Sequence, residues 1–194
     1  SPTDFYLVSG TAMATHDIDH IARHIRPAEC VSVVDITSGY GVLGLMGPQS
    51  RALLQQLAES DLGRDMFPFG TVQNVMIAGA PVRVLRISFV GELGYELHVP
   101  TEYLLTVYDA LHGMGVEHGL VNAGYRAIDS LRLEKQFCAW GAEVGQDNSL
   151  MEAGLGFAVD FNKTDYALQG RFCENNVLTL KNQRILRFGR FVVY

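Results

Sequence analysis

The order of the strand-like and helix-like runs constrains the fold of this chain more than any other feature. We expect strands at residues 5–10, 31–36, 40–47, 71–79, 81–88, 95–99 and 154–161, and helices at residues 15–26, 48–60, 101–115 and 122–137. The strands thus come in runs, and the helices lie between the runs. This order favours an α+β fold with a mainly antiparallel sheet over a doubly wound parallel fold.

The composition is that of an ordinary globular protein and argues against two classes of partner. The chain has 194 residues, of which 48% are hydrophobic and 19% are charged, which is enough for a packed core. Its formal net charge of −6 and the lack of any Lys/Arg run argue against a nucleic-acid partner. No run of roughly 18 apolar residues is present, so no membrane partner is expected. The cysteines are three in number and far apart, so we expect reduced thiols and no metal site.

Glu96 lies in a strand-like run after Gly94, where the neighbouring residues favour packing. Alternation places Tyr95 on one face of that strand and Glu96 with His98 on the other. One interpretation is that Glu96 lies on the solvent-facing side of an edge strand. The other is that Glu96 lies at the mouth of a pocket. There its two oxygens would accept hydrogen bonds from an N–H donor pair, such as the edge of a pterin or guanine.

Arg126 lies in the first turn of the helix expected at 122–137, with Asn122 as a candidate cap. A cation at this end opposes the helix dipole by about 0.3–1 kcal/mol. Asp129 could offset this charge as an i,i+3 partner, or it could pair with Arg132, which we expect on a solvated face. Alternatively, the Arg126 guanidinium grips an anionic or carbonyl group of a ligand.

The catalytic motifs of common enzyme classes do not occur in this chain. We find no nucleophile elbow with a Ser-His-Asp order, no P-loop and no dinucleotide-binding fingerprint. Trp140, the single tryptophan, follows the helix expected at 122–137 and precedes Gly141. An indole at the end of an element is either a lid on the core or a ring that flanks a flat heterocycle.

Three longer motifs carry a family resemblance. The stretches "GPQSRALLQQL", "SFVGELGYELHVP" and "NAGYRAIDSLRLEK" occur in this order and at these separations. Together they resemble the tetrahydrofolate-binding aminomethyltransferase family, to which the T-protein of the glycine cleavage system belongs. The residues of these motifs are most similar to the C-terminal folate domain of sarcosine and dimethylglycine dehydrogenases. The match extends from about Asp4 to Phe172.

The resemblance implies a fold, a ligand and site residues. It implies a ferredoxin-like α+β part with a mainly antiparallel sheet, followed in the family by a smaller barrel that is missing here. Tetrahydrofolate would be the ligand, with its pterin edge held by Glu96 next to Tyr95 and a second contact from Arg126. Trp140 stands where the family has a Tyr, which keeps an aromatic surface but loses a hydroxyl. FAD would be bound by a flavin domain of the same polypeptide in the parent enzyme, and not by this chain.

Departures from the family pattern shape the remaining expectations. The position of the family's catalytic Asp lies upstream of this sequence, so no catalytic residue is assigned. We expect a folate-binding domain at residues 1–174, truncated at its N-terminal side, and a divergent tail at 175–194. The resemblance implies the mitochondrial matrix as location. The alternatives are a non-catalytic regulatory protein of the same architecture, similar to the regulatory subunit of pyruvate dehydrogenase phosphatase, and a truncated inactive isoform.

Overall fold

The computed structural model describes residues 3–145, 147–149 and 151–155, and these form two compact units. The larger unit contains residues 12–137. The smaller unit contains residues 3–11 and the described residues from 138 to 155. The domain boundary expected near residue 174 lies outside the described residues, as does most of the strand expected at 154–161.

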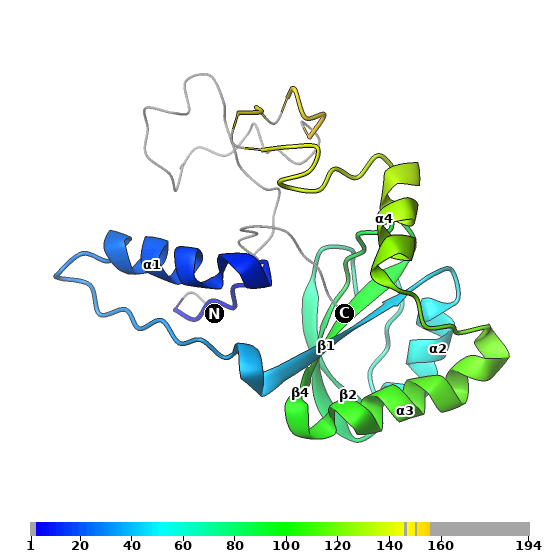
Figure 1. The fold of residues 1–194 in the computed structure, drawn as a ribbon. Coiled ribbons are helices and arrows are strands. Elements are labelled where there is room, and N and C mark those ends of the chain that lie inside the picture. Colours follow the sequence, from blue (N-terminus) through cyan, green and yellow to red (C-terminus); the bar gives the residue numbers. More distant parts are fainter. Residues whose placement is uncertain (1–2, 146, 150, 156–194) are drawn as a thin grey trace. The chain divides into compact units, whose positions relative to one another are not determined.

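The larger unit contains the regular elements (Figure 1). Its strands are β1 (Tyr40–Met46), β2 (Val72–Ile77), β3 (Ala80–Leu85) and β4 (Gly94–Pro100), and its helices are α1 (Ala14–His24), α2 (Ser50–Leu57), α3 (Leu104–Gly115) and α4 (Tyr125–Glu134). Short 3₁₀ turns precede β1 at Thr37–Gly39 and α3 at Thr101–Tyr103. Within the described residues, no helix has the length and apolar character needed to cross a membrane.

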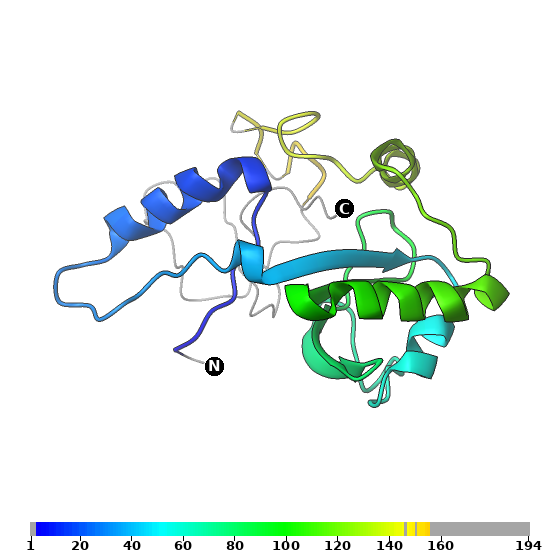
Figure 2. The ribbon, with the colours of Figure 1, turned by 60° about the horizontal axis from the view of Figure 1, so that its bottom comes forward.

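The four strands form one sheet in the order β1-β4-β3-β2, and every neighbouring pair is antiparallel. Helices α2 and α3 pack on one face of this sheet, and Figure 2 shows α3 lying alongside β1. The α+β fold with an antiparallel sheet is therefore confirmed.

The hydrophobic core lies between the sheet and these two helices. Alternate residues of each strand point into it, as the two-residue period of a strand requires. The core side chains are Leu45 from β1, Val75 and Ile77 from β2, Ala80, Val82 and Val84 from β3, Tyr95, Leu97 and Val99 from β4, Leu53 and Leu54 from α2, Val107 and Leu111 from α3, and Leu62 and Phe67 from the connection between α2 and β2. The second face of the sheet therefore carries the alternate set of residues, which includes Glu96 and His98 of β4.

The β2–β3 hairpin has a tight two-residue connection. Ala78 and Gly79 form its two-residue loop, and both have positive φ angles, 50° and 77°. Positive φ at both loop positions is the geometry of a type I′ turn, whose twist matches that of the flanking strands. The turn therefore fixes the antiparallel register of β2 and β3.

Two expected strands are wrong. Residues 5–10 contribute only an isolated bridge at Val8, and residues 31–36 form no strand. Four apolar side chains of the latter segment are exposed, namely Val31 at 54%, Val33 at 40%, Val34 at 72% and Ile36 at 43%. β-Branched side chains fit the surface of a sheet, which is why this segment was expected to be a strand. A strand also needs a neighbouring strand to pair with, and the composition of a segment does not provide one.

Candidate functional site

Strand β4 occupies an inner position of the sheet, between β1 and β3. All of its residues except Pro100 are buried, and Glu96 is only 2% exposed. The interpretation of Glu96 as a solvent-facing residue of an edge strand is therefore wrong. The side chains of an inner strand are buried on both faces when both faces of the sheet are covered. The alternation of apolar and polar residues in the sequence does not show whether a strand is in such a position.

The register of the sheet separates Tyr95 from Glu96. Tyr95 points into the core, where its hydroxyl accepts a hydrogen bond from Nε of Arg51 at 3.1 Å and its ring packs on Phe67. Glu96 lies on the second face, paired with Gly44 of β1 and Leu85 of β3. The structure thus brings these two sequence neighbours to opposite sides of the sheet.

The second face holds a buried acid and a buried imidazole side by side. His98 is 2% exposed, and its Nε2 lies 3.7 Å from Oε2 of Glu96. That separation exceeds the range of a hydrogen bond. Oε2 of Glu96 accepts no hydrogen bond within the described part of the chain. Burying a carboxylate oxygen without a donor is unfavourable, and such an atom calls for an explanation.

The turn before β4 contacts the end of α4. Gly91 has a φ of +76°, and a Cβ built there would lie 2.2 Å from Cγ of Lys135. Nζ of Lys135 lies 3.3 Å from a carboxylate oxygen of Glu92. Gly91 is therefore required both by its backbone conformation and by the Lys135 stem that lies against it. Two of the sequence motifs, the one that leads into β4 and the one that forms α4, meet at this point.

Arg126 lies at the opposite end of α4 and is exposed. Arg126 and Lys135 are nine positions apart in the sequence, which corresponds to roughly 13 Å along a helix. No hydrogen bond or ion pair of Arg126 is found among the residues that the structure describes. The helix begins after Gly124 without a side-chain cap, and Asn122 instead contacts His112 and Tyr108. The expected Asn122 cap is therefore wrong.

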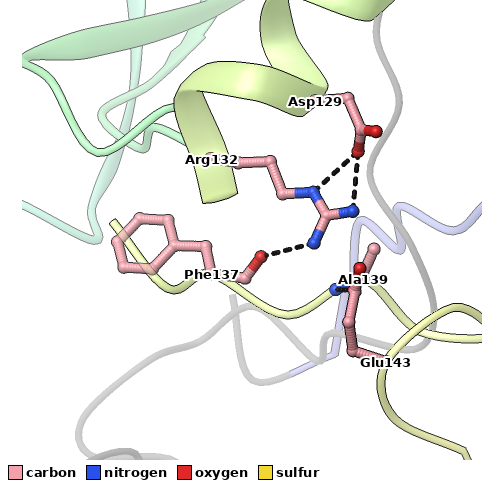
Figure 3. A network of polar contacts seen from close by, with 5 residues as sticks. All are labelled: Asp129, Arg132, Phe137, Ala139 and Glu143. Atoms are coloured by element: carbon pink, nitrogen blue, oxygen red, sulfur yellow. Dashed lines mark hydrogen bonds and ion pairs between the residues drawn. The ribbon is translucent and has the colours of Figure 1, made fainter. Parts of the chain in front are cut away.

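Asp129 pairs with Arg132 (Figure 3). Its Oδ1 lies 2.6 Å from Nη2 and 2.8 Å from Nε of Arg132, and Nη1 donates to the carbonyl of Phe137 at 2.9 Å. Arg132 is 2% exposed, so its expected place on a solvated face is wrong. The guanidinium thus ties the segment that follows α4 back to the helix.

Trp140 belongs to the smaller unit and is 46% exposed. It forms an isolated parallel bridge with Val144, and Gly141 between them has a φ of +81°. The carboxylate of Glu143 accepts the Ala139 N–H at 2.8 Å and closes this turn (Figure 3). The indole of Trp140 therefore stands on a hydrogen-bonded turn with about half of its surface open.

The sequence matches the GCVT N-terminal domain family over residues 1–163. The chain belongs to this family. Mitochondrial sarcosine dehydrogenase of Mus musculus is 46% identical over 168 residues, which cover 86% of this chain and 18% of that protein. Mitochondrial dimethylglycine dehydrogenase of Homo sapiens is 40% identical over 164 residues, which cover 84% of this chain and 19% of that protein. An aminomethyltransferase of Listeria monocytogenes serotype 4b is 34% identical over 163 residues, which cover 84% of this chain and 43% of that protein.

This GCVT-family chain thus spans less than a fifth of the two dehydrogenases that it matches. Heterotetrameric sarcosine oxidase from Corynebacterium sp. U-96, a solved structure, has a TM-score of 0.43 and 20% identity over 50% of this chain and 49% of that one. The family resemblance expected from the three motifs is confirmed.

A second buried arginine of the GCVT-family chain was also missed by the strand pattern. Arg86 is 8% exposed, although it alternates with apolar residues in the sequence. Its Nη1 donates to the carbonyl of Phe67, and burial, followed by the nearby charge of Arg51, lowers the pKa of the Arg86 guanidinium below its ordinary value. This side chain ties the turn after Phe67 to the sheet.

A row of histidines on α1 was missed as well. His16, His20 and His24 recur every four residues, and the ring centroids are 6.3 Å apart for the first pair and 4.3 Å for the second. Nδ1 of His24 lies 2.7 Å from the carbonyl of His20. The four-residue spacing within an expected helix is the sequence signal for such a row. Among the described residues, however, no group of three or more His, Cys, Asp or Glu is arranged to hold a metal ion.

Proposed function

We propose that this chain is the tetrahydrofolate-binding portion of a mitochondrial sarcosine dehydrogenase-like flavoenzyme. It would hold reduced folate so that the one-carbon unit from oxidative N-demethylation is captured as 5,10-methylenetetrahydrofolate. Family membership and the names of the relatives, which are mitochondrial sarcosine and dimethylglycine dehydrogenases and aminomethyltransferases, support this function. The partners would be reduced folate and a flavin domain of the same polypeptide that carries FAD, in the mitochondrial matrix.

The buried carboxylate of Glu96 is the observation that carries the proposal. Glu96 is 2% exposed on an inner strand, and its Oε2 accepts no hydrogen bond within the described residues. A carboxylate accepts two parallel hydrogen bonds, and the N–C–NH₂ edge of a pterin donates two. A bound pterin would therefore supply the donors that this oxygen lacks.

The remaining site residues have positioning roles in this proposal. The exposed guanidinium of Arg126 is free to contact a carbonyl or anionic group of the ligand. The half-open indole of Trp140 offers a flat surface for an aromatic ring. Tyr95 points into the core, so its contribution is to hold β4 through Arg51 and Phe67. Bound tetrahydrofolate would supply the N5 and N10 atoms that take up the one-carbon unit, and the protein would contribute their position.

Isothermal titration calorimetry with 5-formyltetrahydrofolate tests the proposal on the full chain. We expect Glu96→Gln to weaken binding by roughly tenfold or more, because an amide cannot accept both donors and hydrogen bonds to a charged group contribute about 1.5–3 kcal/mol. Glu92→Gln is the matched control, since the side chain of Glu92 is 43% exposed and pairs with Lys135. Equal affinity of wild type and Glu96→Gln would remove the pterin assignment. Absence of binding by the wild type would favour the non-catalytic interaction protein.

A further inference from the structure

We infer that Gly44 is a specificity-determining position of the ligand site. Because glycine has no side chain, a flat ring can reach the Glu96 carboxylate past this position. This inference rests on the proposed folate site and assigns one more residue to it.

The register of the sheet places Gly44 directly beside Glu96. Gly44 of β1 is paired with Glu96 of β4, and Val42 is paired with His98. Side chains of directly opposed residues project from the same face, with Cβ atoms about 4.5–5.5 Å apart. Any side chain at position 44 would therefore stand next to the carboxylate.

Neither packing nor backbone conformation requires a glycine at this position. A Cβ built on Gly44 would meet only Cε of Met46, at 3.6 Å, which is an ordinary van der Waals contact. Gly44 is also absent from the residues with positive φ. Gly41 in the same strand is different, because a Cβ there would lie 2.4 Å from Cδ2 of Leu104. Core packing thus explains Gly41 and leaves Gly44 unexplained.

The surroundings of Gly44 suit an approaching ring. Gly44 is exposed although it lies in β1 opposite a residue that is 2% exposed. On the other side of Glu96, the paired residue of β3 is Leu85, which is 1% exposed. A glycine inside a strand often marks a bulge, a tight bend or the close approach of a ligand or another backbone, and the unbroken register of β1 with β4 excludes a bulge. Open backbone on one side and an apolar wall on the other fit a planar heterocycle whose donor edge faces the carboxylate.

The test compares Gly44→Ala and Gly44→Val with the wild-type full chain. We expect both variants to fold with an unchanged or higher Tm, because each replaces a strand glycine at an open position. We expect Gly44→Val to weaken binding of 5-formyltetrahydrofolate by about tenfold or more, with a smaller loss for Gly44→Ala, since the added methyl groups occupy the ligand's place. Gly113→Ala is the matched control, because a Cβ built on Gly113 of α3 meets nothing within 4 Å, and α3 packs on the other face of the sheet.

The outcomes separate this inference from the proposed function. A folded Gly44→Val protein with wild-type affinity, together with lost binding in Glu96→Gln, would overturn the role of Gly44 and keep the folate site. Wild-type affinity in both variants would overturn the folate site itself. Should Gly44→Val have a lowered Tm, Gly44→Ala with a wild-type Tm decides the question: unchanged affinity contradicts the inference, and weakened binding supports it.

Discussion

Replacing Glu96 by glutamine should stabilise the protein without ligand, in addition to weakening its binding of folate. The side chain of Glu96 is 3% exposed, and Oε2 has no hydrogen-bond donor within the described residues. A buried polar group without a partner costs about 1–3 kcal/mol, and a charged one costs more. Glutamine keeps the shape and removes the charge. We therefore expect a gain of about 1–2 kcal/mol in the free energy of unfolding, which corresponds to a rise in Tm of about 2–8 °C for a chain of this size.

A structural role for Glu96 predicts the opposite sign. Nε2 of His98 lies 3.7 Å from Oε2 of Glu96, and both side chains are buried. If these two residues formed an ion pair that holds the sheet together, removal of the carboxylate would take away the charge partner of a buried imidazolium. Breaking a buried ion pair in this way costs about 3–5 kcal/mol. The measured sign therefore distinguishes a carboxylate reserved for a ligand from one that stabilises the fold.

Urea unfolding of the unliganded protein, followed by circular dichroism, measures this difference. Amide hydrogen exchange of β4 locates the effect in the sheet. Glu92→Gln is again the control, because its ion pair with Lys135 joins side chains that are 43% and 45% exposed. Exposed pairs contribute about 0–1 kcal/mol, so this variant should unfold near the wild-type midpoint. A loss of more than about 1 kcal/mol in Glu96→Gln would refute the reasoning.

Two further predictions concern the polar contacts outside the site. Asp129→Ala should cost about 1.5–3 kcal/mol and lower the hydrogen-exchange protection of residues 125–137, because Asp129 is bonded to the buried guanidinium of Arg132. Asp109→Ala on the exposed side of α3 is the control, and equal protection in both variants would contradict the role of this pair. Thr37→Val should raise the pKa of Asp35 toward its ordinary value, because the Thr37 hydroxyl and then its N–H hold that pKa low. Since the folded-state pKa is depressed, the Asp35 carboxylate supports its turn above the ordinary range of Asp and loses this effect as the pH falls through the lowered pKa. An NMR titration of the Asp35 carboxyl carbon measures this, and an unchanged pKa in Thr37→Val would contradict it.

Local sequence patterns were enough to predict the helices, most of the strands and the family. The sequence predicted the helices that correspond to α1, α2, α3 and α4 and the consecutive strands that correspond to β2 and β3. These features depend on contacts between residues that are close in the chain, so their patterns can be read directly from the sequence. The three long motifs likewise identified the family, because they occur in one order and at fixed separations.

The tertiary structure alone decided which polar residues are buried. The alternation around Glu96 is the same for an inner strand and an edge strand, and only the positions of β1 and β3 made it inner. Arg132 shows the same pattern, since it was expected on a solvated face, and both Arg132 and Arg86 are buried by partners that local spacing does not reveal. Conversely, residues 31–36 have the composition of a strand, but within the described part of the chain they pair with no other strand. Burial and strand pairing depend on residues that are far apart along the chain, whereas periodicity reports only on near neighbours.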